Sequence, residues 1–176
     1  MDPTEILTAE HRVIRSALSA LLRIAHRLDR QEPIEPEHVR DVVAFLRRYA
    51  DGLHHEKEEQ ILFPALRGLE LPNAGGPIAD LLHEHAVGAA LLDAMDAALD
   101  RGLPNGGAAP FAAAAHEYCR LVRRHTDKEE RHVFPLARTT LPPVLQRTVA
   151  DALRRHRVAH AREQERCLAL LEPRIR

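Results

Sequence analysis

HHEKEEQILFP, at residues 54–64, and HTDKEERHVFP, at residues 125–135, are two versions of one phrase. Each copy begins with a histidine, places a glutamate four residues later and ends on Phe-Pro. A solvated charge run would explain the lysines and glutamates, but not the matching histidine, glutamate and Phe-Pro positions. The chain therefore contains an internal repeat. If each copy is α-helical, its histidine and its glutamate lie on the same helix face.

The composition is that of a helical globular protein. The 176 residues are 45% hydrophobic, 29% charged and only 3% aromatic, so the core must be built from aliphatic side chains. Such a composition favours helices over strands. The 25 basic and 26 acidic residues nearly balance. We therefore expect neither nucleic acid nor an anionic membrane as a partner.

The cellular setting is inferred from three further features. No apolar run approaches the roughly 20 residues that span a bilayer, and no basic leader precedes an apolar stretch at the start. The two cysteines, Cys119 and Cys167, lack CxxC spacing. A disulfide framework is not predicted, and a buried packing role fits Cys119 better than a nucleophilic one. We expect a cytoplasmic protein.

Proline- and glycine-rich stretches divide the chain into five predicted helices. They cover approximately residues 3–30, 37–69, 78–101, 108–139 and 144–171. The fold class is therefore all-α, an up-down-up-down four-helix bundle with an additional C-terminal helix. Residues 1–141 form the bundle in this interpretation, and residues 142–176 pack on it or face a partner. The two Phe-Pro pairs are predicted to kink or tighten their helices.

Four histidines are predicted to lie at one level of this bundle. At a rise of about 1.5 Å per residue, His11 lies about 25 Å before the first loop and His54 about 26 Å after it. His85 lies about 24 Å before the loop of the second hairpin and His125 about 25 Å after it. In antiparallel helices, equal distance from the turn means equal height. Glu58 and Glu129 follow one turn along from His54 and His125.

Four imidazoles and two carboxylates at one level match two divalent cations. Carboxylates left unpaired in an aliphatic core would cost several kcal/mol each. Imidazole and carboxylate without thiolate suit iron, manganese or zinc, and two symmetrically placed carboxylates can bridge two ions. The plain alternative is a metal-free bundle in which the histidines only form hydrogen bonds.

The choice of residues within each motif leaves alternatives. His55 and Glu59 form a second HxxxE, but aligning the two Phe-Pro pairs matches His54 with His125 and leaves His55 opposite Thr126. His54 and Glu58 are therefore preferred. His83 lies about 200° around the helix from His85, so only one of the two faces inward, and the Glu-His pattern selects His85.

Several other side chains are weaker candidates for ligands. Glu129 and His132 form a single ExxH, whereas ferritin-like centres need two such motifs. His156 and His160 are spaced i, i+4 and fit a solvated or partner-facing surface better than a second metal site. Tyr49 and Tyr118 lie upstream on the ligand helices, but neither is at a clean i−4 position.

The chain resembles the hemerythrin-like, HHE cation-binding domain family over about residues 3–140. The resemblance rests on EHRVIR (10–15), HHEKEEQILFP (54–64), GPIADLLHEH (76–85) and HTDKEERHVFP (125–135). It implies a four-helix bundle with a non-haem di-iron centre bridged by carboxylates and an oxo or hydroxo group, with zinc or manganese as alternative occupants. By motif, the iron ligands would be His11, His54, Glu58, His85, His125 and Glu129.

One departure from the family pattern guides the functional expectation. The oxygen-carrying hemerythrins that this chain resembles have a fifth histidine one turn from the third-helix ligand. In this chain the positions four residues before and after His85 are Leu81 and Ala89. We therefore expect a site short of one imidazole, whose open positions favour chemistry over storage. The leading hypothesis is that the protein reacts with hydrogen peroxide, dioxygen or nitric oxide. Among these, decomposition of hydrogen peroxide is preferred, which would make the protein a di-iron enzyme similar to a catalase or peroxidase.

The alternative is an iron- or oxygen-sensing or binding module without turnover. In that interpretation the C-terminal helix is the surface for a protein partner or for dimerisation, through its basic stripe. The stripe consists of Arg154, Arg155, Arg157, Arg162 and Arg166. The sequence leaves the choice between enzyme and sensor open.

Overall fold

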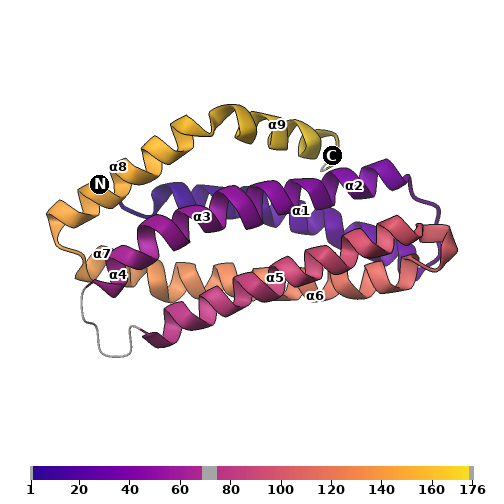
Figure 1. The fold of residues 1–176 in the computed structure, drawn as a ribbon, viewed down its shortest axis with the longest axis horizontal. Helices are drawn as coiled ribbons and strands as arrows, with labels where there is room; N and C mark the ends of the chain where they lie inside the picture. Colours follow the sequence, from indigo (N-terminus) through magenta and orange to yellow (C-terminus); the bar gives the residue numbers. More distant parts are fainter. Residues whose placement is uncertain (1, 69–74, 175–176) are drawn as a thin grey trace.

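The structure is a computed structural model that describes residues 2–68 and 75–174. All regular structure in these residues is helical, as predicted, and the described part contains no strand. Four long antiparallel helices form a bundle, and a further pair of helices lies along one side of it (Figure 1). The segment 69–74, where the second helix was predicted to end, lies outside the described residues.

The four bundle helices follow the predicted segments closely. The first is α1 (Glu5–Asp29) and the third is α5 (Gly75–Arg101). The second runs continuously through α2 (Pro36–Phe45), η1 (Leu46–His54), α3 (His55–Lys57), η2 (Glu58–Leu62) and α4 (Phe63–Arg67). The fourth comprises α6 (Ala108–Lys128), η4 (Glu129–Val133) and α7 (Phe134–Thr140). Here η1, η2 and η4 are π-helical stretches.

Local sequence explains where these helices begin and end. Pro36 occupies the first turn of α2, where its missing N–H costs nothing. Between α5 and α6 the chain reverses through η3 (Leu103–Asn105), flanked by Gly102 at φ 89° and Gly106 at φ 88°. Glycine adopts this left-handed region without steric penalty. The turn therefore follows from the GLPNGG sequence that predicted it.

The helix turns before the two Phe-Pro pairs differ from the predicted tightening. Both η2 and η4 end immediately before Phe-Pro, at Leu62 and Val133. Proline lacks an N–H and its ring crowds the carbonyl four residues earlier, which the helix must accommodate. It does so here by widening into a π-turn, so the expected tightening is wrong. Both widened turns begin at a repeat glutamate, Glu58 or Glu129, and π-turns of this kind are frequent at functional sites.

The apolar core is divided into two clusters. The larger lies toward the ends of the bundle that carry the α1–α2 and α5–α6 connections and includes Leu18, Leu21, Val42, Leu92 and Phe111. The smaller lies toward the opposite end and includes Leu7, Phe63, Leu81, Phe134 and Leu153. On each bundle helix the histidine of interest falls between the residues of these two clusters. A buried polar level therefore crosses the bundle between two apolar ones.

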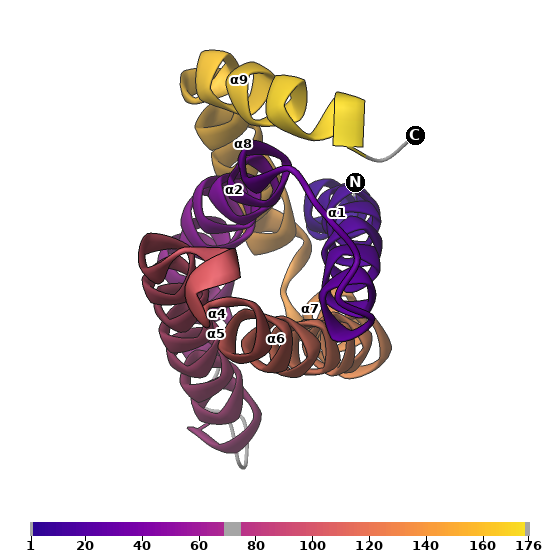
Figure 2. The same ribbon diagram turned by 90° about the vertical axis from the view of Figure 1, so that its right-hand side faces the viewer.

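The C-terminal segment packs on the bundle as two helices. These are α8 (Pro143–Ala159) and α9 (Ala161–Leu171), followed by η5 (Glu172–Arg174). They cover the helix formed by α2 to α4, as the end-on view shows (Figure 2). Leu153 joins the smaller apolar cluster and Cys167 the larger. The single helix predicted for 144–171 is thus interrupted at His160.

No described helix combines the length and apolar character needed to cross a membrane.

Candidate metal centre

The six predicted side chains meet in the interior of the bundle. His11, His54, His85 and His125 come from four different helices and are each at most 5% exposed, and Glu58 and Glu129 are fully buried. The Nε2 atoms of His11 and His54 are 3.1 Å apart, as are those of His85 and His125. His83 is exposed and His85 is buried, so His85 is the one of the two that faces the interior.

Each carboxylate reaches histidines of both hairpins. Glu58 places one oxygen 3.3 Å from Nε2 of His54 and the other 3.5 Å from Nε2 of His85. Glu129 places one oxygen 3.2 Å from Nε2 of His11 and 3.4 Å from Nε2 of His125. The two glutamates therefore cross between the two histidine pairs, which is the position expected of bridging ligands.

Each of the four histidines uses its other ring nitrogen to donate to a glutamate. The Nδ1 atom of His54 lies 2.9 Å from Glu10, and that of His125 lies 2.9 Å from Glu84. The Nδ1 atoms of His11 and His85 bond in the same way to Glu130 at 2.8 Å and to Glu59 at 2.6 Å. Every accepting glutamate is the chain neighbour of a residue in the central cluster. Such hydrogen bonds fix the orientation and tautomer of metal-binding imidazoles.

Cations complete this outer layer. Lys57 lies 3.1 Å from the second oxygen of Glu10, and Lys128 lies 2.7 Å from the second oxygen of Glu84. Arg15 pairs with Glu130 at 2.9 Å. These roles were not among the predictions made from the sequence. The sequence does contain a pattern that could have predicted them. Both repeat copies contain Lys-Glu-Glu, and the glutamates that the two lysines contact are those of the two Glu-His pairs.

The chemistry of the donors fits a pair of cations. In a neutral imidazole whose Nδ1–H is donated, Nε2 carries a lone pair. Four such lone pairs then face one another and the oxygens of Glu58 and Glu129. These four carboxylate oxygens have no hydrogen-bond partner in the described structure. Buried acceptors that face only acceptors are strongly unfavourable. Two divalent ions at the centre would satisfy all of them.

The glutamates around His54 favour a proton on its imidazole. Burial disfavours the charged form of His54, but the negative charges of Glu58 and Glu10 outweigh this and raise the pKa of His54 to about 10. Burial likewise opposes ionisation of Glu58, yet His54 holds its pKa well below the ordinary value. Cation binding must displace the proton of this imidazolium, which makes metal affinity dependent on pH.

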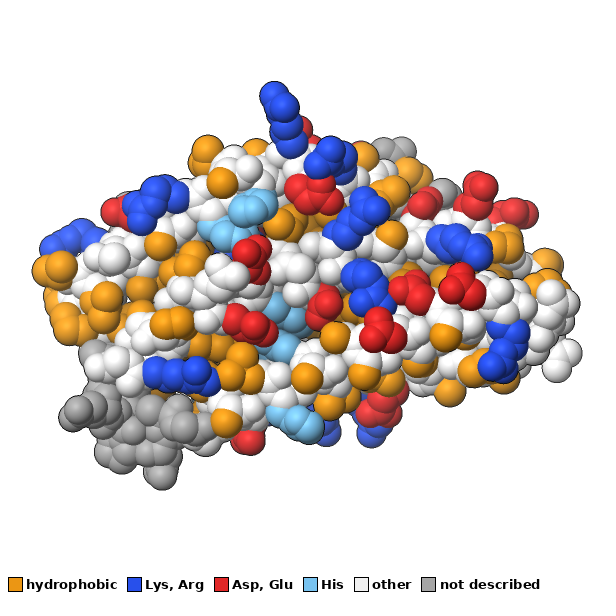
Figure 3. Space-filling view, in the orientation of Figure 1, with side chains coloured by type: hydrophobic (Ala, Val, Ile, Leu, Met, Phe, Trp, Pro, Cys, Tyr) orange, Lys and Arg blue, Asp and Glu red, His pale blue; other side chains and the backbone are white. Residues whose placement is uncertain are grey.

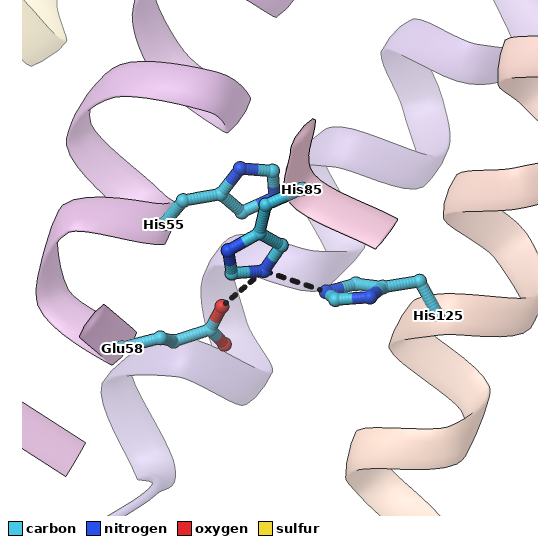
Figure 4. A group of neighbouring side chains, drawn as sticks. All are labelled: His55, Glu58, His85 and His125. Carbon is cyan, nitrogen blue, oxygen red and sulfur yellow. Dashed lines mark hydrogen bonds and ion pairs between the residues drawn. The ribbon is translucent and has the colours of Figure 1, made fainter. Parts of the chain in front are cut away.

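A fifth imidazole belongs to the cluster. An atom of His55 lies within 4.8 Å of ligand atoms of Glu58, His85 and His125, and its ring stacks on His85 at 3.7 Å and 9° (Figure 4). Burial lowers the pKa of His55 to about 3, although Asp51 opposes this, so the ring is neutral. Leu81 and Ala89 leave His85 without a second imidazole one turn away on its own helix, as expected, but His55 places a fifth ring beside it. The fifth ring comes from the second helix instead of the third.

The cluster is consequently asymmetric. In the repeat, the residue that corresponds to His55 is Thr126, which is buried. Its hydroxyl donates to the carbonyl of Arg123 and accepts from Arg15. One half of the cluster thus offers three imidazoles, from His55, His85 and His125, and the other offers two, from His11 and His54. Two ions bound here would have different surroundings.

The remaining candidates lie apart from these contacts or have other partners. His132 is exposed. Tyr49 stacks on Phe45 with ring centroids 4.9 Å apart. Tyr118 packs beside Gly88, and its buried hydroxyl has no hydrogen-bond partner among the described residues. Cys119 and Cys167 are both buried and free, so the packing role predicted for Cys119 agrees with its position.

Comparison with known proteins also indicates a cation-binding domain. A family model described as the hemerythrin HHE cation-binding domain matches residues 2–137, which is most of the chain. A search of curated proteins and a search of solved structures gave no match. The family match spans all four bundle helices and every residue of the buried cluster. The chain therefore belongs to the hemerythrin HHE cation-binding domain family.

Proposed function

We propose that the protein holds two iron ions in the buried cluster and reacts there with a small oxidant, hydrogen peroxide being the first candidate. One observation carries the proposal. The oxygens of Glu58 and Glu129 are buried without hydrogen-bond partners, between two pairs of imidazole nitrogens that approach to 3.1 Å. Histidine with carboxylate ligands suits iron, and the family binds cations.

The outer carboxylates support a redox role. Each central histidine donates its Nδ1–H to a glutamate, namely Glu10, Glu59, Glu84 or Glu130. A carboxylate acceptor makes the opposite ring nitrogen a stronger donor to a metal. Stronger donation stabilises the more highly charged state of an ion. The cluster is therefore suited to hold iron through an oxidation change without losing it.

The size of the reactant follows from burial. The central side chains are almost completely enclosed, and the most exposed members are His55 at 6% and His85 at 5%. Imidazole side chains can be seen at the surface between neighbouring helices in Figure 3. A surface depression of about 450 Å³ near Leu28 and Leu103 contains none of the cluster. These features favour a reactant of two to four atoms over an organic substrate.

Peroxide is preferred because its decomposition needs no further partner. Two molecules of hydrogen peroxide give one of dioxygen and two of water, so one is oxidised by two electrons and the other is reduced by two. A pair of bound iron ions supplies two one-electron changes, which matches this requirement. The His11–His54 side has fewer imidazoles than the side that includes His55, so an ion held there would have fewer protein donors and more room for a small molecule.

Dioxygen release from the iron-loaded protein tests this proposal. We expect excess hydrogen peroxide to give many dioxygen molecules per chain, in a ratio of one to two peroxides consumed. Glu58→Gln should retain at most one iron and lose turnover, whereas His83→Ala, an exposed histidine on the same helix as His85, should match the wild type. Release of less than one dioxygen per chain by fully iron-loaded protein would exclude turnover.

A sensing or binding role is the second candidate. It is favoured by the surface of α8 and α9, where Val158 is 73% exposed beside the basic side chains of this segment. In that case the iron-loaded protein should react once with peroxide or dioxygen and stop. Amide exchange in residues 143–171 should then differ between the reduced and oxidised forms. Turnover with unchanged exchange in this segment would argue against sensing.

A further inference from the structure

The C-terminal segment breaks at a histidine for an identifiable reason. Helix α8 ends at Ala159 and α9 begins at Ala161, with His160 at φ −106° and ψ 15°. The backbone N–H of His160 and its own Nδ1 both bond to the carbonyl of His156, at 3.1 Å and 2.9 Å. A side chain that competes in this way for a backbone acceptor disturbs the helix.

The break brings two imidazoles together. The rings of His156 and His160 stack with centroids 4.2 Å apart and 26° between their planes. Because His160 donates its Nδ1–H, its Nε2 carries a lone pair. The His156 side chain is only 10% exposed, and its Nδ1 is buried without a hydrogen-bond partner in the described structure. Two neutral rings therefore present nitrogen donors at one place.

A carboxylate approaches the same place from the bundle. An oxygen of Glu56, in α3, lies 3.1 Å from Nε2 of His156. Donor atoms of Glu56, His156 and His160 all lie within 4.8 Å of one another. In Figure 3, histidine side chains with acidic ones beside them can be seen between the α8–α9 segment and the bundle. All three residues are partly exposed, and two imidazoles with one carboxylate are the protein donors of many zinc sites that keep one position open to water.

An ordinary ion pair between His156 and Glu56 explains only part of this arrangement. Such a pair would hold α8 on the bundle without His160. Burial lowers the pKa of His156, as do the nearby charges of Lys57 and His160, while Glu56 opposes the shift. The environment thus favours neutral imidazole, which can bind a cation, over imidazolium, which cannot.

We propose that Glu56, His156 and His160 form a second metal site, for one zinc ion, that is separate from the paired cluster. Imidazole ligands suit zinc among the available divalent ions. Glu56 shares α3 with His55, whereas His156 lies in α8 and His160 lies at the break between α8 and α9. Zinc bound here fastens the α8–α9 junction to the helix that carries Glu58.

Zinc titration of the iron-loaded protein tests the proposal. Calorimetry, with elemental analysis after removal of unbound metal, should show one zinc per chain in addition to the iron. His160→Ala keeps the His156–Glu56 contact and should weaken zinc binding at least tenfold. Glu56→Gln should do the same through a different helix. Zinc should also slow amide exchange in residues 143–171 of the wild type, and His160→Ala should abolish this effect.

The matched control comes from a more exposed group with the same donor types. His26, Asp29 and His116 also lie within 4.8 Å of one another, but His26 and Asp29 are about half exposed. His26→Ala should leave zinc affinity unchanged. The proposal is overturned if the wild type binds no zinc beyond its iron, if zinc replaces iron one for one, or if both His160→Ala and Glu56→Gln bind zinc as the wild type does.

Discussion

The Nζ atom of Lys57 lies 3.1 Å from a carboxylate oxygen of Glu10, and the lysine is completely buried. The other oxygen of Glu10 accepts the Nδ1–H of His54. A buried lysine is costly unless it is paired. Lys57 therefore neutralises a glutamate whose function is to orient a central histidine. Lys128 repeats the arrangement with Glu84 and His125, but its side chain is 33% exposed.

Replacing Lys57 and Lys128 in turn compares the stability contribution of a fully buried ion pair with that of a partly exposed one. Lys57→Met leaves the buried Glu10 with His54 as its remaining partner and should cost about 3–5 kcal/mol of unfolding free energy. Lys128→Met removes a partly solvated pair and should cost no more than about 1 kcal/mol. Urea denaturation of the two variants at equal metal loading measures the difference. Equal losses would mean that burial of the Lys57–Glu10 pair has no special weight.

His55 should contribute to metal retention although it lies outside the repeat pattern. His55→Ala removes one of three imidazoles from the His85–His125 side and should weaken binding there by at least about tenfold, the scale seen when groups around a metal are removed. Competition with a chelator, followed by iron analysis, measures this. His132→Ala, at an exposed position on the fourth helix, is the control and should retain iron fully. Equal retention by both variants would reduce His55 to a packing residue.

Gly107 is required by close packing of the α5–α6 turn. A Cβ atom there would lie 2.2 Å from the carbonyl oxygen of Ala98 and 2.7 Å from that of Gly102. Gly107→Ala should therefore lower the unfolding free energy by about 1–3 kcal/mol, the usual range for overpacking. Gly76→Ala, where nothing lies within 4 Å, should be neutral or stabilising by about 0.5 kcal/mol. Thermal denaturation of both variants compares them directly.

The buried thiol of Cys119 should make stability fall at high pH. Burial raises the pKa of Cys119 from 9.0 to about 12, against the opposing charge of Arg123. The folded state therefore keeps a proton that the unfolded state releases. This contribution is complete below pH 9 and is lost as pH rises toward 12, by at most about 1.4 kcal/mol per pH unit.

Urea denaturation at pH 8 and pH 10 checks the Cys119 prediction. The wild type should lose more stability between these two values than Cys119→Ala does, because only the wild type has this thiol to titrate. Cys167 is present in both proteins and cancels from the comparison. A loss that is identical in the two proteins would mean that Cys119 ionises equally in the folded and unfolded states.

The main architecture could be predicted from the sequence because helix geometry is regular. The rise per residue, together with the loop positions, places His11, His54, His85 and His125 at one height without knowledge of packing. Periodicity and the Glu-His pairs also selected His85 over His83. These inferences depend on distances along the helices, which a sequence specifies well.

Features that depend on rotation about the helix axis could not be predicted. His54 and His55 both face the cluster because π-helical turns end at His54 and begin again at Glu58, which changes the angle between successive side chains. The pairing of each histidine with a glutamate from another helix depends on the same rotation. The break at His160 arises from one imidazole bonding to a backbone carbonyl, a contact that helical periodicity does not encode.

Iron analysis combined with Mössbauer spectroscopy shows whether the crossing carboxylates of Glu58 and Glu129 hold two ions side by side. Protein loaded with iron and freed of excess metal should contain two irons per chain. In the oxidised protein these should form one magnetically coupled pair with two distinguishable sites, reflecting three imidazoles on one side and two on the other. One iron per chain, or two that are magnetically independent, would contradict the account.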